Sequence, residues 1–183
     1  MRKWRPRLSA IIVAMLGIAL AMPLAGLFFF RLQENLLIRQ TESELIAQSA
    51  VVAAVFAEQV MVADVPDGDL GAVAPVWDQT QERYHPVVAK LDLAVDEIGP
   101  RREPALAPAK PETPQFAAIG ARLEPLLAAT QQTTLAGFRI TDPNGVVIAG
   151  KDENGLSLAG VPEVKLALAG LAQTSLRQRV SDQ

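Results

Sequence analysis

The stretch GFRITDPNGVVIAG, Gly137 to Gly150, decides the fold class, because it predicts a β-hairpin in a chain otherwise rich in helix-forming residues. Pro143 presets φ for the second position of a type I turn, Asn144 tolerates the third, and Gly145 accepts the left-handed conformation that follows. Apolar residues of both strands should share one side that needs cover. These residues are Phe138, Ile140, Val146 and Ile148.

Helices and one more strand are predicted around the hairpin. Gln115 to Gln132 has a helical composition, and Pro162 to Leu168 reads as a short helix with proline in its first turn and Gly170 at its end. Thr174 to Val180 alternates as a last strand. This order of elements predicts an α+β domain with an antiparallel sheet.

The middle of the chain predicts little regular structure. Extended backbone is expected around Val87 to Val95. Gly99 to Pro114 carries five prolines in sixteen residues, a composition that opposes helices and central strands. We expect this segment to be an exposed, flexible loop.

The run LSAIIVAMLGIALAMPLAGLFFF, Leu8 to Phe30, predicts a transmembrane helix. Its 23 uncharged residues suffice for a hydrocarbon core of about 30 Å. Residues 1–7 hold four basic residues and no acidic one, which predicts a cytoplasmic N-terminus and an exported remainder. A cleaved signal peptide is the alternative, because Ala19-Leu20-Ala21 has the form of a cleavage site, but the apolar run is long for one.

Residues 31–62 predict a long helix that continues the membrane span, since they contain no Gly or Pro. Apolar residues at three- and four-residue steps allow two interpretations: a seam for a second copy, or a helix packed on its own domain. Arg39 and Ser43 interrupt this stripe. Its members are Leu32, Leu36, Ile46, Ala50, Ala53, Ala57 and Val60.

The charge and residue composition exclude several classes of function. Without the four basic residues of the tail, 13 of the 17 Lys and Arg remain against 20 Asp and Glu, a net charge of −7 that disfavours nucleic acid as a partner. The absence of cysteine excludes disulfides, thiolate metal sites and a cysteine nucleophile. The sequence contains no glycine-rich phosphate-binding loop, no Gly-x-Ser-x-Gly motif and no pair of His or Cys residues at the spacing of metal ligands. Neither a catalytic residue nor a metal site is therefore predicted.

A few ionisable residues are candidates for ligand binding. Arg177 and Arg179 lie two residues apart and should share one face of the last strand, where their guanidinium groups would suit an anion. Arg139 and Lys151 are further candidates for the same anion site. His85, the only histidine, is a candidate ligand or pH-sensing group. The alternative for Arg177 and Arg179 is an exposed strand face without a ligand, and the alternative for His85 is an ordinary loop residue. Three carboxylates cluster near the proline-rich segment: Asp92, Asp96 and Glu97. They are interpreted either as a solvated surface or as the source of a catalytic pair of carboxylates.

The basic tail, the membrane span, the helix over 31–62, ITDPNGVVIAG and GLSLAGVPEVKLALAGLAQTSLRQRV together resemble the front end of a bacterial sensor histidine kinase. The resemblance implies a PAS-like or Cache-type sensor domain over 63–183, in the periplasm, anchored in the inner membrane as a homodimer. It also implies a small-molecule or protein signal passed through a second membrane helix to a HAMP segment and a kinase. ATP, Mg²⁺ and a response regulator would belong to that kinase, and no cofactor is expected in residues 1–183.

The sequence departs from that family in its output region. No second membrane span and no HAMP pattern follow, and His85 lacks the setting of a phosphoacceptor, so the chain is expected to be a fragment of a longer protein or a truncated reading frame. The alternatives are the sensor segment of a chemoreceptor or of a cyclic-nucleotide enzyme, and a stand-alone membrane-anchored periplasmic binding or structural protein.

Overall fold

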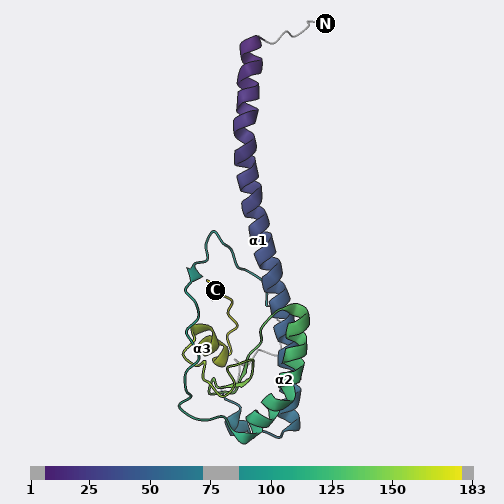
Figure 1. The fold of residues 1–183 in the computed structure, drawn as a ribbon, viewed down its shortest axis with the longest axis vertical. Helices are drawn as coiled ribbons and strands as arrows, with labels where there is room; N and C mark the ends of the chain where they lie inside the picture. Colours follow the sequence, from purple (N-terminus) through teal and green to yellow (C-terminus); the bar gives the residue numbers. More distant parts are fainter. Residues whose placement is uncertain (1–6, 72–86, 179–183) are drawn as a thin grey trace, which may run out of the picture.

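A computed structural model describes residues 7–71 and 87–178, in which a long helix carries the rest of the chain on its C-terminal half (Figure 1). This helix, α1 (Leu8–Val62), has 55 residues and is about 80 Å long. It passes through Pro23 without a break. The two helices predicted over 8–30 and 31–62 are therefore one helix, as expected.

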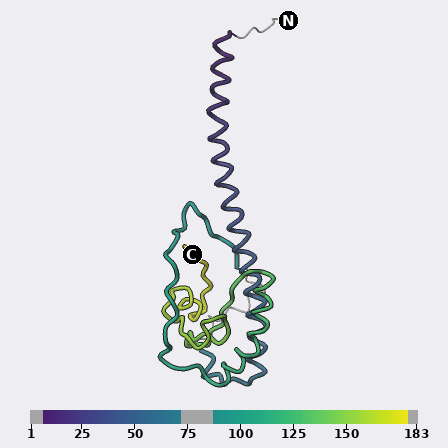
Figure 2. The backbone as a smooth tube through the Cα atoms, in the orientation of Figure 1, coloured from purple at the N-terminus to yellow at the C-terminus, as the bar shows by residue number. Residues whose placement is uncertain are grey.

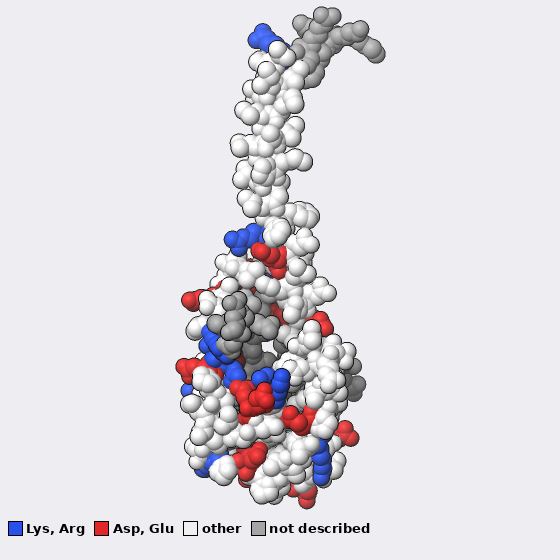
Figure 3. All heavy atoms as spheres, viewed as in Figure 1, with Lys and Arg blue, Asp and Glu red and all other residues white. Residues whose placement is uncertain are grey.

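The N-terminal part of α1 projects away from the folded part and makes no packing contact. Its most apolar stretch, long enough to cross a membrane, has no buried residue. Figure 3 shows the projecting part white between the blue spheres at its tip and the blue and red spheres where it nears the domain, whereas both signs of charge are mixed over the domain itself. Such a surface matches hydrocarbon rather than water.

The second helix, α2 (Pro114–Thr134), covers the hairpin. It contains the helix predicted over 115–132, begins with Pro114 in its first turn, and is capped by Leu135 in the left-handed conformation. Its buried residues recur at three- and four-residue steps, which gives one apolar face. This face consists of Phe116, Ile119, Gly120, Leu123 and Leu127. The short helix α3 (Pro162–Leu168) has the predicted bounds, and Gly170 follows it with a φ of 81°.

The predicted hairpin is present as β2 (Ile140–Thr141) and β3 (Val147–Ala149), which pair antiparallel with a bulge. Its turn is closed by a 2.9 Å hydrogen bond from the Gly145 amide to the Asp142 carbonyl. Gly145 has a φ of 79°, and a Cβ there would lie 2.8 Å from the Ala159 Cβ. Glycine is therefore required by conformation and by space.

The prediction that the hairpin has one apolar side was too simple, because β3 is buried on both sides. One face of β3 joins the main core with α2 and the end of α1, through Ile148. The other face places Val147 against Leu158 and Val161 in a second, smaller core. A strand covered on both faces has no reason to alternate apolar and polar residues.

The remaining strands form a separate sheet rather than extending the hairpin. β1 (Ile98–Gly99) pairs in parallel with β4 (Leu176–Arg177). The α+β class is confirmed, but the described residues form two two-stranded sheets instead of one antiparallel sheet. Each strand of the second sheet is two residues long, since Pro100 follows β1 and cannot donate a hydrogen bond within a sheet.

The middle of the chain is mostly irregular, as predicted. A 3₁₀ turn, η1 (Asp67–Asp69), follows α1. Extended backbone is expected around 87–95, but residues 87–92 form no strand and a turn occupies 93–95. The strand of this region is β1, a few residues later. The segment from 99 to 114 runs along the outside of the domain (Figure 2). Leu106 of this segment and Ser157 exchange backbone hydrogen bonds of 3.0 and 2.7 Å.

Packing on its own domain accounts for part of the apolar stripe on α1. Val60 of the predicted stripe packs against the main core, and so do Val52, Val55 and Phe56, which were not among the predicted positions. The other stripe positions differ: Ile46 is half-buried, whereas Leu32, Leu36, Ala50, Ala53 and Ala57 are exposed. A seam for a second copy on the exposed positions stays a prediction.

Candidate functional site

Three polar residues on one face of α1 hold the segment Lys90–Leu93, an arrangement that we call the clasp. Asn35, Arg39 and Glu42 are spaced i, i+4 and i+7, so they face the same way. The Asn35 amide nitrogen donates to Asp92 Oδ1 at 3.0 Å, and the Leu93 amide donates to Asn35 Oδ1 at 3.0 Å. Arg39 donates to the Leu91 carbonyl at 3.0 Å and to Asp92 Oδ2 at 3.3 Å.

Glu42 connects α1 to two distant parts of the chain at once. Its Oε2 accepts from the backbone amides of Lys90 and Leu91, both at 2.8 Å, and its Oε1 accepts from the Thr174 hydroxyl at 2.7 Å. The residue is 2% exposed. A buried carboxylate is tolerated when donors surround it, and Glu42 has three.

The protonation state of Glu42 follows from this environment. Burial alone raises the pKa of a carboxyl group, but the hydrogen bonds from the Leu91 amide, the Thr174 hydroxyl and the Lys90 amide outweigh burial. The positive charge of Lys90 acts in the same direction. The pKa of Glu42 is therefore below its ordinary value, and the residue is an anion at neutral pH.

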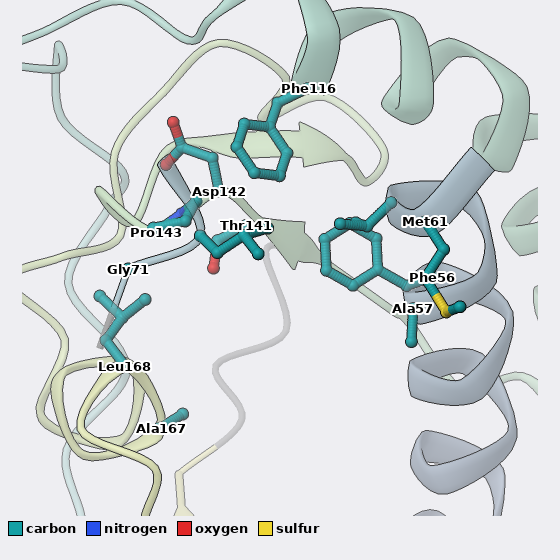
Figure 4. Close-up of a pocket in the computed structure, with 12 residues that line it drawn as sticks. Phe56, Ala57, Met61, Gly71, Phe116, Thr141, Asp142, Pro143, Ala167 and Leu168 are labelled. Atoms are coloured by element: carbon teal, nitrogen blue, oxygen red, sulfur yellow. The ribbon is translucent and has the colours of Figure 1, made fainter. Parts of the chain in front are cut away.

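An apolar cavity of about 440 Å³ lies between the end of α1, the start of α2, the hairpin turn and the end of α3 (Figure 4). Phe56, Met61, Phe116 and Leu168 line it. Asp142 is its only ionisable lining residue among those described, and the Asp142 carboxylate caps the turn by accepting from the amides of Asn144 and Val146, both at 2.9 Å. The chemistry of the cavity suits a neutral apolar group rather than an anion.

The predicted anion site at Arg177 contains an internal carboxylate. Arg177 makes a bidentate pair with Glu163, with Nε–Oε1 at 2.9 Å and Nη2–Oε2 at 2.8 Å, and its Nη1 donates to the Pro100 carbonyl at 3.2 Å. The Ser175 hydroxyl also donates to Glu163. Although burial raises the pKa of Glu163, these bonds lower it overall. An external anion at Arg177 has to compete with Glu163.

Arg139 lies in a different ion pair and is not brought next to Arg177. Its Nε donates to Glu153 Oε2 at 2.6 Å, and Arg102 donates to the other oxygen of Glu153 at 2.5 Å. Burial raises the pKa of Glu153, but its bonds to Arg102 and Arg139 outweigh burial and lower the pKa. Lys151 is exposed.

Two predicted site residues, His85 and Arg179, lie outside the described residues. Of the carboxylate group, Asp92 belongs to the clasp, and Asp96 Oδ2 accepts from the Asp92 amide at 2.6 Å. Glu97 is exposed. Across residues 7–71 and 87–178, no group of His, Asp and Glu is arranged to hold a metal ion.

Sequence reasoning missed the clasp. Arg39 looked like an interruption of an apolar stripe, although with Asn35 and Glu42 it forms a polar face of its own. The i, i+4, i+7 spacing of the three residues was the available signal. Their partners are mainly backbone groups of Lys90–Leu93, which no residue pattern identifies. Comparison of the chain with protein-family models, curated proteins and solved structures finds no match.

Proposed function

We propose that this chain is the extracytoplasmic sensor segment of a transmembrane sensor histidine kinase. The observation that carries the proposal is the continuity of α1, which runs unbroken from an uncharged segment long enough to span a membrane into the folded domain. A rigid helix of this kind transmits a displacement at one end to the other. In this proposal α1 anchors the domain in the inner membrane, with the N-terminus in the cytoplasm.

The course of the C-terminal segment supports the same function. After α3 the chain turns back along α1 toward its apolar end (Figure 1), and Thr174 contacts Glu42. Glu42 is 12 residues beyond Phe30, which is about 18 Å along the helix. The last described residues are thus directed toward the membrane side of the domain, where a returning membrane helix would begin.

We extend the proposal to the type of sensor domain, its oligomeric state and its output. The domain would act as a PAS-like or Cache-type sensor in a homodimer, with ATP and Mg²⁺ bound only by a downstream kinase domain that phosphorylates a response regulator. The same α1 architecture also suits a chemoreceptor or a cyclic-nucleotide enzyme, and an output domain found beyond Gln183 would distinguish among them.

Two experiments test the proposal. A reporter enzyme that is active only after export, fused after Gln183, should be active, and immunoblotting should show the fusion at its uncleaved size. Sequencing of the gene beyond Gln183 should reveal an apolar run of about 20 residues and then a kinase with a phosphoacceptor histidine. A reporter active only in the cytoplasm would refute the topology, and a cleaved fusion would refute the anchor. A reading frame that ended at Gln183 would refute the kinase.

A further inference from the structure

We infer that the hydrogen bond between Thr174 and Glu42 is a releasable latch that holds the segment Ala172–Gln178 against α1. The latch involves only residues of this chain and needs neither a second copy nor a ligand. Its consequence for signalling rests on the proposed function, because only a sensor would use the position of this segment relative to α1 as an output.

The two oxygens of Glu42 have separate tasks. Oε2 binds the backbone of Lys90 and Leu91, and Oε1 binds Thr174. Loss of the Thr174 bond therefore leaves Glu42 fixed by the rest of the clasp. The C-terminal segment can separate from α1 without unfolding the contact between α1 and Lys90–Leu93.

The segment Ala172–Gln178 is otherwise attached to other parts of the domain. Ser175 and Arg177 bind Glu163 of α3, β4 pairs with β1, and the Gln178 amide donates to the Gly99 carbonyl at 3.0 Å. Among the described residues, Thr174–Glu42 is the only hydrogen bond between this segment and α1. When it breaks, the segment remains attached to α3 and β1 but is free to shift along α1.

Among residues 7–71 and 87–178, packing around the bond is loose, which permits this shift. A cavity of about 800 Å³ separates α1 from the segment, with Leu45, Ser49 and Ala53 on the α1 side and Ala172 and Gln173 on the other. A tightly interdigitated contact would hold the two elements together by dispersion over many atoms. Here one charge-assisted hydrogen bond bridges the gap, so the bond decides between an attached and a detached arrangement.

The absence of cysteine makes the latch measurable in the full chain. Ser49→Cys and Gln173→Cys place the only two thiols on opposite sides of the cavity, and both positions are exposed. With spin labels on both thiols and the chain in lipid nanodiscs, pulsed electron paramagnetic resonance gives the distribution of distances between α1 and the segment. We expect one narrow distribution in the background that carries only the two cysteines.

Thr174→Val is the decisive variant, because it keeps the shape of the side chain and removes the donor. We expect it to raise the ratio of long to short distances about tenfold, the effect of losing a hydrogen bond to a charged group. Thr174→Ser retains the donor and should preserve the distribution. Thr41→Val is the matched control, since the Thr41 hydroxyl bonds only to the Leu37 carbonyl of its own helix.

Amide hydrogen exchange at Lys90 and Leu91 separates release of the latch from unfolding. Both amides should stay protected in Thr174→Val, because their bonds to Glu42 Oε2 remain. An unchanged distance distribution in Thr174→Val, or equal broadening in Thr41→Val, would overturn the latch. Loss of protection at Lys90 and Leu91 would also overturn it, by showing that the clasp and the segment open together. None of these outcomes depends on the membrane topology or on a downstream kinase.

Discussion

Gly120 of α2 lies against the backbone of Ile148 in β3 so closely that a Cβ on residue 120 would be 1.9 Å from the Ile148 carbonyl oxygen. The helix and the strand meet there in the main core. Gly120→Ala should therefore force α2 away from β3 and lower the free energy of unfolding by about 2 kcal/mol. Chemical denaturation in nanodiscs, followed by circular dichroism, would measure this loss.

The matched control for this prediction is Gly160→Ala. Gly160 has open space around its Cα, so the same added methyl group meets no atom within 4 Å. Its stability should change by less than about 0.5 kcal/mol. Equal losses in the two variants would show that close approach at Gly120 is not what holds α2 on the hairpin.

A second prediction concerns the Asp142 carboxylate, which is 1% exposed and caps the hairpin turn. Asp142→Ala leaves the amides of Asn144 and Val146 without their acceptor, and an unsatisfied buried donor costs about 1–3 kcal/mol. Asp142→Asn keeps an acceptor oxygen at that position, so its thermal midpoint should lie between those of the wild type and Asp142→Ala. If Asp142→Ala melted at the wild-type temperature, the cap would not stabilise the turn.

Elements with local signals could be predicted from the sequence, and those that depend on distant partners could not. α3 follows from Pro162 at its start and Gly170 after its end, and the hairpin follows from its turn residues. β1 pairs with β4 through Ile98 and Leu176 and through Gly99 and Arg177. Each strand has only two residues, which is too short to show an alternating sequence pattern. The parallel sheet was therefore missed, although a strand was expected at residues 174–180.

The same distinction applies to the candidate site. The sequence identified Arg177 as a charged residue on a strand. It did not reveal that the Arg177 guanidinium would donate two hydrogen bonds to the Glu163 carboxylate of α3. Opposite charges 14 residues apart, with a turn between them, give no periodic signal. The residues of the clasp share a helix face, yet their function depends on a segment some fifty residues away whose backbone supplies most of the partners.

The bond between Arg177 and Glu163 leads to a third prediction, about the proposed anion site. If an external anion binds Arg177, it competes with the Glu163 carboxylate, so Glu163→Gln should increase the stabilisation that the anion provides. We expect phosphate and succinate to raise the thermal midpoint of Glu163→Gln more than that of the wild type, and Arg177→Ala to abolish the effect. Equal shifts in all three proteins would assign anion binding to another part of the chain.

The last prediction is loss of stability in acid. The pKa values of Glu42, Glu153 and Glu163 are below the ordinary value of 4.5 in the folded chain, because hydrogen bonds and cations outweigh burial. Their stabilisation is complete above the unfolded pKa of 4.5 and is lost as the pH falls through the lower folded values, since the unfolded chain then binds more protons. The free energy of unfolding should therefore not change through these groups between pH 8 and pH 6 and should decrease steeply below about 4.5.

Glu42→Gln tests the contribution of the clasp to this acid dependence. The glutamine oxygen can still accept from the Lys90 and Leu91 amides, and its amide group can donate to Thr174, but the side chain no longer titrates. The charged groups around position 42 are Arg39 on α1 and Lys90 and Asp92 on the facing segment, and all three are unchanged in this variant. We expect Glu42→Gln to have a shallower dependence of unfolding free energy on pH below 4.5, by up to one proton, measured by urea titrations at half-unit pH steps.

Glu44→Gln is the control, because Glu44 is exposed and bonds only to Gln48 on the same helix, so its pH dependence should match that of the wild type. A slope in Glu42→Gln equal to that of the control would show that Glu42 does not contribute to acid unfolding.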